Sequence, residues 1–198
     1  MFVSFEGLDG SGKTTQLRLL AERLTAEGQT VVETREPGGT ELGEAIRDLV
    51  LHGGNVAPWA EAALYAASRA QHVQDVIRPA LARGSIVLCD RYLDSSVAYQ
   101  GVARGLGLER VLELNLAAVG GLLPDVTFLL QVDATVAESR MTGHRDRLER
   151  EDASFHARAA DGYRELAARF PERVVVLDAA LRPGELAERI HGAFRSHS

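Results

Sequence analysis

The chain has 198 residues, of which 45% are apolar and 25% charged, so a single globular domain with its own core is expected. The net charge of −6 argues against a nucleic-acid-binding surface, and the absence of an apolar run of about 18 residues or of a leader pattern argues against membrane insertion and secretion. The one cysteine, Cys89, cannot form an internal disulfide, which fits a reducing cytoplasm.

Short apolar runs alternate along the chain with segments of helical periodicity. We predict strands at residues 2–6, 30–34, 85–89, 126–132 and 173–177. We predict helices at residues 14–27, 40–51, 58–83, 94–101, 108–119, 133–141, 153–170 and 183–195. Strands separated by helices predict right-handed crossovers, and therefore one α/β domain over residues 1–198 with a five-stranded parallel sheet and helices on both faces.

Residues 7–14 match the phosphate-binding pattern G-x-x-x-x-G-K-T, between a predicted strand and a predicted helix. In this P-loop, backbone N–H groups and the helix N-terminus face phosphate oxygens, the lysine reaches the β and γ phosphates, and the threonine hydroxyl ligates Mg²⁺. Lys13 is the only lysine among the 22 basic residues, which indicates that an ammonium is needed there. The predicted ATP-binding residues of the loop are Gly7, Leu8, Asp9, Gly10, Ser11, Gly12, Lys13, Thr14 and Thr15.

Asp90 directly follows the predicted strand at 85–89, which puts it at the carboxyl edge of the sheet beside the P-loop. A carboxylate there can hold Mg²⁺ directly or through water, so Thr14 and Asp90 are the predicted metal ligands. The alternative is an aspartate that only caps the next turn. Guanine-specific switch proteins carry an N-K-x-D motif, and this chain has no second lysine to form one.

Four segments resemble those of thymidylate kinases and occur in the expected order. They read FEGLDGSGKTTQ at 5–16, TREPGGT at 34–40, DRYLDSSVAYQG at 90–101 and DRLERE at 146–151. The resemblance implies a P-loop kinase that transfers the γ-phosphate of ATP to dTMP with Mg²⁺, giving dTDP and ADP. It also implies a homodimer, the usual state of that family.

The resemblance further implies a dTMP site. In it Asp9 faces the 3′-hydroxyl, Pro37 lies near the thymine methyl, and Arg35 or Glu36 lies near the phosphates and metal. The Tyr65 ring stacks on thymine, Arg69 bonds the O4 edge, and Arg91 grips the phosphate. Ser96 and Gln100 bond the base edge, and Tyr99 packs on the deoxyribose. The predicted substrate-binding residues are Asp9, Arg35, Glu36, Pro37, Tyr65, Arg69, Arg91, Ser95, Ser96, Tyr99 and Gln100.

Several of these residues also have a structural interpretation. Asp9 and Pro37 are common in turns, Tyr65 and Arg69 fit one face of an amphipathic helix, and Ser95 or Ser96 fits a helix cap.

Phosphoryl transfer needs positive charge at the equatorial phosphate oxygens. Some thymidylate kinases have a P-loop arginine, but here the corresponding residue is Gly10. The resemblance therefore implies the type whose arginines come from a lid, at about residues 140–152 with a hinge at Gly143. Arg140 is predicted to pack on adenine. The predicted catalytic residues are Lys13, Asp9, Arg91, Arg145 and Arg147. The alternative is a solvated, ion-paired segment, because acidic residues lie between the arginines.

Two other functions remain open at this point. A related kinase would act on another nucleotide or nucleoside, and substrate competition separates it from a dTMP kinase. A regulatory P-loop ATPase would hydrolyse ATP slowly without stimulation by any monophosphate.

Overall fold

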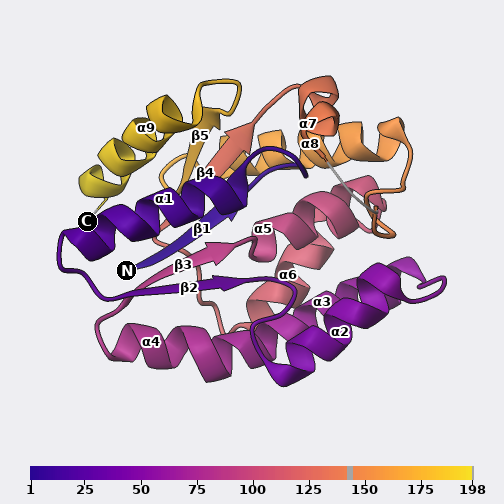
Figure 1. Ribbon diagram of the computed structural model, residues 1–198. Coiled ribbons are helices and arrows are strands. Elements are labelled where there is room, and N and C mark those ends of the chain that lie inside the picture. Colours follow the sequence, from indigo (N-terminus) through magenta and orange to yellow (C-terminus); the bar gives the residue numbers. More distant parts are fainter. Residues whose placement is uncertain (142–144, 198) are drawn as a thin grey trace.

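The computed structural model describes residues 1–141 and 145–197 (Figure 1). Its strands are β1 (Phe2–Glu6), β2 (Val31–Arg35), β3 (Ile86–Asp90), β4 (Val126–Gln131) and β5 (Val174–Asp178). They form one parallel sheet in the order β2-β3-β1-β4-β5, which confirms the predicted sheet. The P-loop strand β1 is therefore central, and Asp90 pairs with Phe5 on one side and Arg35 on the other.

Within residues 1–141 and 145–197, nine α-helical segments and two π-helical segments accompany the strands. The α-helices are α1 (Lys13–Ala26), α2 (Glu41–His52), α3 (Pro58–His72), α4 (Arg78–Ala82), α5 (Leu93–Ser96), α6 (Leu108–Ala118), α7 (Ala134–Arg140), α8 (Ala153–Arg169) and α9 (Pro183–Ser196). The π-helical segments are η1 (Val73–Ile77) and η2 (Val97–Ala103). No helix of the described residues is both long and apolar enough to span a membrane.

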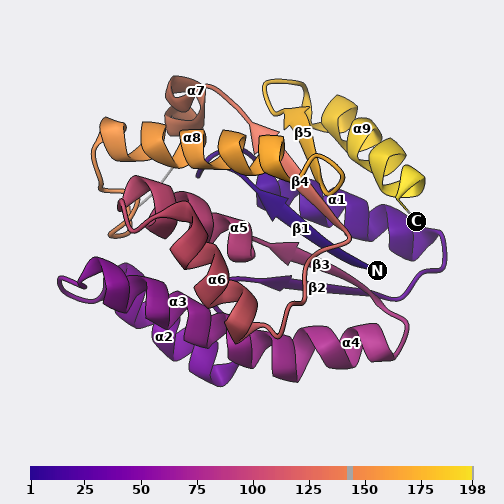
Figure 2. The same cartoon turned by 180° about the vertical axis from the view of Figure 1, so that it is seen from behind.

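Both faces of the sheet are covered, as predicted. Helices α1 and α9 lie on one face, where Leu20 and Ile190 pack with Phe5 and Phe128 (Figure 1). The helices between β2 and β4, together with α8, cover the other face (Figure 2). The central strands are buried along almost their whole length, because each is flanked by strands and covered on both faces.

Two predicted helices differ from those in the structure. The helix expected at 58–83 is divided by η1, which ends just before Pro79, a residue without the N–H for a regular helical hydrogen bond. The helix expected at 94–101 becomes α5 and η2, in which Arg104 N bonds Tyr99 O five residues back. In both places a wider turn changes which side chains share a face.

Candidate active site

The P-loop is held in shape by glycines in contact with other elements. Gly7, Gly10 and Gly12 have φ values of 135°, 80° and 92°, which side chains rarely adopt. A Cβ on Gly7 would lie 2.4 Å from the Leu130 oxygen, and one on Gly10 would lie 2.1 Å from the Ala137 oxygen. The loop therefore packs directly on β4 and α7, without space for a side chain at either position.

Lys13 lies inside this loop and is 7% exposed. Its Nζ donates to the carbonyl oxygens of Gly7 and Leu8, at 3.1 and 2.9 Å. Burial, and next the charge of Arg91, lower the pKa of Lys13 to about 8. The ammonium is thus positioned at the loop by backbone contacts.

Thr14 and Asp90, the predicted metal ligands, are in direct contact. The Thr14 hydroxyl donates to Asp90 Oδ2 at 2.6 Å. Asp90 is the last residue of β3, whereas the sequence predicted that it would directly follow the strand. A hydroxyl and a carboxylate oxygen side by side at a phosphate loop are ligands of the kind that Mg²⁺ prefers.

A cavity of about 660 Å³, the P-loop cavity, lies over the loop. It is lined by Asp9, Gly10, Ser11, Gly12, Lys13, Thr14, Thr15, Gln16, Arg35, Glu36, Arg47, Asp90, Arg91, Arg140, Ala179, Leu181, Pro183 and Leu186. Arg140 Nη1 donates to the Ala179 oxygen at 2.9 Å, which joins α7 to the loop after β5. The predicted ATP-binding residues Gly7 and Leu8 support the loop and do not line this cavity.

A second cavity of about 140 Å³, the inner cavity, adjoins it. It is lined by Asp9, Glu36, Pro37, Arg47, Leu51, Tyr65, Arg69, Arg91, Ser95, Ser96, Tyr99, Gln100, Asp146, Leu148 and Glu149. All the predicted substrate-binding residues except Arg35 line it. Four residues line both cavities: Asp9, Glu36, Arg47 and Arg91.

Arg91 lies at the boundary between the cavities. It has the left-handed φ of 70°, an uncommon conformation for a side-chain-bearing residue. Its guanidinium donates to Asp9 Oδ1 at 2.5 Å and to Ser95 Oγ and Tyr163 Oη at 3.1 and 3.2 Å. Burial alone would raise the pKa of Asp9, but the charges of Arg91 and Lys13 outweigh it and lower that pKa to about 2. Asp9 is therefore ionised beside the arginine.

Glu6 lies beneath this pair and had no assigned role in the sequence. It is 1% exposed and accepts hydrogen bonds from the Tyr92 amide and from the Ser95 and Tyr163 hydroxyls. Burial, and next the charge of Asp94, raise the pKa of Glu6 to about 7. Its sequence signal is a carboxylate that ends a buried strand just before the P-loop.

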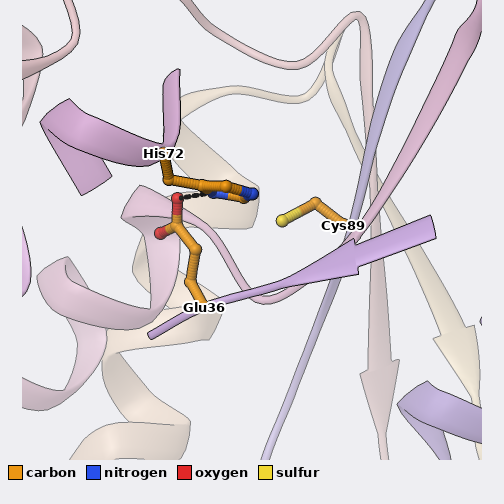
Figure 3. Close-up of side chains that lie close together, drawn as sticks. All are labelled: Glu36, His72 and Cys89. Carbon is orange, nitrogen blue, oxygen red and sulfur yellow. Dashed lines mark hydrogen bonds and ion pairs between the residues drawn. The ribbon is translucent and has the colours of Figure 1, made fainter. Parts of the chain in front are cut away.

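Glu36 is held from two sides. Its Oε2 accepts from Arg69 Nε at 2.6 Å, and its Oε1 contacts His72 Nδ1 at 2.9 Å. Figure 3 shows Glu36, His72 and Cys89 pointing toward one another. The remaining ring nitrogen of His72 contacts Thr34 Oγ1, and Cys89 Sγ donates to the Arg91 oxygen. Each donor atom of this cluster has a protein partner, so the cluster functions as a support for Glu36 and Arg69.

Tyr65 and Arg69 share one face of α3, as predicted, and both are buried. Arg69 contacts Glu36, the Ser96 hydroxyl, Asn115 Oδ1 and the Tyr92 oxygen. Arg35 instead forms a two-bond ion pair with Glu44, at 2.8 and 2.9 Å, beside the P-loop cavity.

The lid arginines occupy different places. Arg145 lines a third cavity with Leu8, Asp9 and His156. Arg147 contacts Glu61 Oε2 at 2.6 Å and the Val50 oxygen at 2.8 Å, and it lines neither the P-loop cavity nor the inner cavity. The predicted hinge at Gly143 lies outside the described residues.

Three residues of the site carried no sequence signal. Arg47 on α2 lines both cavities and donates to the Pro37 oxygen, but an arginine on an amphipathic helix is ordinary. Tyr163 and Glu61 reach the site from α8 and α3 through contacts with residues distant in sequence. Among the site residues that the sequence analysis did not name, only Glu6 has a signal in the sequence, which is its position at the end of a buried strand just before the P-loop.

A P-loop next to a second cavity that is lined by arginines, on a five-stranded parallel sheet, defines a P-loop nucleoside monophosphate kinase. The sequence model of the thymidylate kinase family matches residues 5–190. The chain belongs to the thymidylate kinase family.

Individual relatives agree with this assignment. The thymidylate kinase of Synechococcus sp. (strain JA-3-3Ab) is 53% identical over 96% of this chain and 93% of its own. That of Leifsonia xyli subsp. xyli (strain CTCB07) is 54% identical over 96% and 92%. The crystal structure of the Ehrlichia chaffeensis thymidylate kinase is 34% identical, covers 98% of both chains and has a TM-score of 0.83. The predicted family, fold and enzyme class are therefore confirmed.

Proposed function

We propose that this enzyme transfers the γ-phosphate of ATP to dTMP, with ATP in the P-loop cavity and dTMP in the inner cavity. The observation that carries the proposal is that the two cavities adjoin at Asp9, Glu36, Arg47 and Arg91. The γ-phosphate of ATP and the phosphate of dTMP would meet there. Three cationic side chains line this region: Lys13, Arg47 and Arg91. The larger cavity suits the larger nucleotide.

Catalysis in this arrangement is positioning and charge stabilisation. The acceptor is a phosphate anion, so no general base is needed. Lys13 and the N-terminus of α1 bind the donor phosphates, and Arg91, braced by Asp9, orients the acceptor phosphate. Of the two predicted lid arginines, Arg145 lines a cavity that Asp9 also lines, whereas Arg147 contacts Glu61.

A bound Mg²⁺ would be held by Thr14 and Asp90, whose oxygen atoms lie 2.6 Å apart beside the P-loop. The ion supplies neutralisation of the charge on the donor phosphates. This donor set of hydroxyl and carboxylate fits the metal.

The test is ADP release with ATP and Mg²⁺ in the presence of dTMP, dUMP, dCMP, UMP or no acceptor. We expect strong stimulation by dTMP only. Lys13→Ala should lower kcat at least about 100-fold, because it removes the ammonium that contacts the phosphates. Equal rates with and without every monophosphate would refute the kinase assignment and favour a regulatory ATPase.

Two further predictions belong to the proposal. The homodimer is supported by exposed apolar side chains on adjacent helices, Leu42 and Leu49 on α2 and Trp59 on α3. The cytoplasmic location rests on the single buried cysteine, Cys89, and stays a prediction.

A further inference from the structure

Gln100 in the inner cavity is held by a residue outside it. Its Nε2 donates to Glu61 Oε1 at 2.8 Å. Gln100 is 2% exposed and Glu61 is fully buried. The amide nitrogen is therefore held by Glu61, which leaves Oε1 and the second N–H of the amide for a ligand in the cavity.

Glu61 accepts from three side chains at once. Besides Gln100, Arg104 donates to both carboxylate oxygens at 3.3 and 3.2 Å, and Arg147 donates to Oε2 at 2.6 Å. An ionised carboxylate accepts hydrogen bonds and donates none. Glu61 accepts from Gln100 as it does from the two arginines, so Gln100 presents its NH₂ group to Glu61 and not its oxygen.

Arg69 supplies the opposite polarity in the same cavity. Four of its five N–H groups are used by Glu36, Ser96, Asn115 and the Tyr92 oxygen. The remaining one is a donor, while Gln100 Oε1 is an acceptor. Both residues line the inner cavity. A donor and an acceptor in one cavity match a pyrimidine with a 4-oxo group and an N3–H, and mismatch a 4-amino pyrimidine, whose N3 has a lone pair.

We propose that Glu61 is a positioning residue for base selection: through the Gln100 amide, it makes the inner cavity select 4-oxo over 4-amino pyrimidines. Glu61 does not touch the substrate. The inference rests on the proposed assignment of the inner cavity to a pyrimidine nucleotide. It explains why a carboxylate is buried behind the cavity with several donors around it.

The test compares dTMP with 5-methyl-dCMP, which differ only at the 4-position and N3. In Glu61→Gln the side chain at position 61 can donate or accept, so the Gln100 amide can turn over and donate to N3. We expect the preference for dTMP, as a ratio of kcat/KM and of Kd, to fall about ten- to hundredfold. Parallel loss with both nucleotides, at an unchanged ratio, would overturn the proposal.

Arg104→Met is the matched control. It removes two hydrogen bonds to Glu61 and leaves the Gln100 contact, so the ratio should stay at the wild-type value. If the preference for dTMP fell equally in Arg104→Met, the cause would be a general loosening of the inner cavity, and this result would also overturn the proposal. If thermal melting shows that Glu61→Gln does not fold, Glu61→Asp replaces it: its shorter carboxylate withdraws from Gln100, and the same fall is expected.

The Kd values of dTMP and 5-methyl-dCMP can be measured by calorimetry without enzymatic turnover. Absence of dTMP turnover in the wild type would therefore refute the proposed function, while the Kd ratio would still decide the role of Glu61.

Discussion

Glu6 is a carboxylic acid in the interior of the molecule, and two of its three hydrogen-bond donors, the Ser95 and Tyr163 hydroxyls, also contact Arg91. Its pKa of about 7 means that it binds its proton more tightly in the folded than in the unfolded protein, where the ordinary value is 4.5. Between these values the folded state carries more protons than the unfolded state. The contribution of Glu6 to stability is therefore fully present below about pH 4.5 and is lost as the pH rises through about 7.

Glu6→Gln, which cannot ionise, should remove this component of the pH dependence. Measured by urea unfolding at pH 5 and pH 8, the loss of unfolding free energy on going to pH 8 should be smaller in the variant by roughly 3 kcal/mol. Glu22→Gln, at an exposed position of α1, serves as the control and should behave as the wild type. Identical pH dependence in all three proteins would contradict the raised pKa.

Single residues differ in how far the sequence could predict them. The P-loop residues are contiguous, and Asp90 ends a recognisable buried strand, so local patterns suffice. Tyr163 and Glu6 touch although they are 157 positions apart, and Glu61 meets Arg147 across 86 positions. Such contacts depend on how α3 and α8 pack against η2 and the lid segment, which no local pattern encodes.

At the level of elements, α7 lies directly against the P-loop at Gly10. Gly10→Ala would set a Cβ 2.1 Å from the Ala137 oxygen and also require a left-handed φ of 80°. Gly12→Ala meets only the second difficulty, since no atom lies within 4 Å of its Cβ position and its φ is 92°. Comparison of Gly10→Ala with Gly12→Ala therefore separates the cost of the left-handed backbone from the cost of the contact with α7.

We expect Gly12→Ala to lower the unfolding free energy by about 1–2 kcal/mol, the cost of the left-handed conformation. Gly10→Ala should lose about 1–3 kcal/mol more, because α7 must move. Chemical denaturation measures both. KM for ATP should also rise in Gly10→Ala, since displacement of α7 carries Arg140 away from Ala179. An equal loss of unfolding free energy in Gly10→Ala and Gly12→Ala would contradict this prediction, because it would show that α7 moves without an energetic cost.

Most elements were predictable because alternation of apolar strands and amphipathic helices is a local property of the sequence. The π-helical segments were not, although Pro79 inside the expected helix at 58–83 was a usable signal for η1. For η2 the structure offers a tertiary reason: Gly162 of α8 lies so close that a Cβ would be 2.9 Å from Ala98 Cα. That approach is set by packing between segments distant in the chain.

For the whole molecule, the exposed apolar side chains on α2 and α3 indicate where a second copy would bind. Leu42 and Leu49 are seven positions apart on one face of α2, and they are 48% and 55% exposed. In Leu49→Asp a charge would be buried at the interface. We expect the mass in solution, measured by light scattering, to fall from that of a dimer toward that of a monomer.

Leu123→Asp is the control, because Leu123 is also exposed, at 38%, but lies outside α2 and α3. It should leave the mass unchanged. A wild-type protein that is monomeric at micromolar concentration would refute the homodimer, and a dimer unaffected by Leu49→Asp would mean that it forms through another surface.

The burial of Lys13 has a consequence for chemical labelling. Because it is the only lysine of the sequence, its Nζ is the one lysine amine that amine-directed reagents can acylate there. This atom belongs to the P-loop and donates to two carbonyl oxygens. The acylation rate of Lys13 is thus a built-in reporter of P-loop occupancy, which follows nucleotide binding in the unmodified enzyme without an introduced probe.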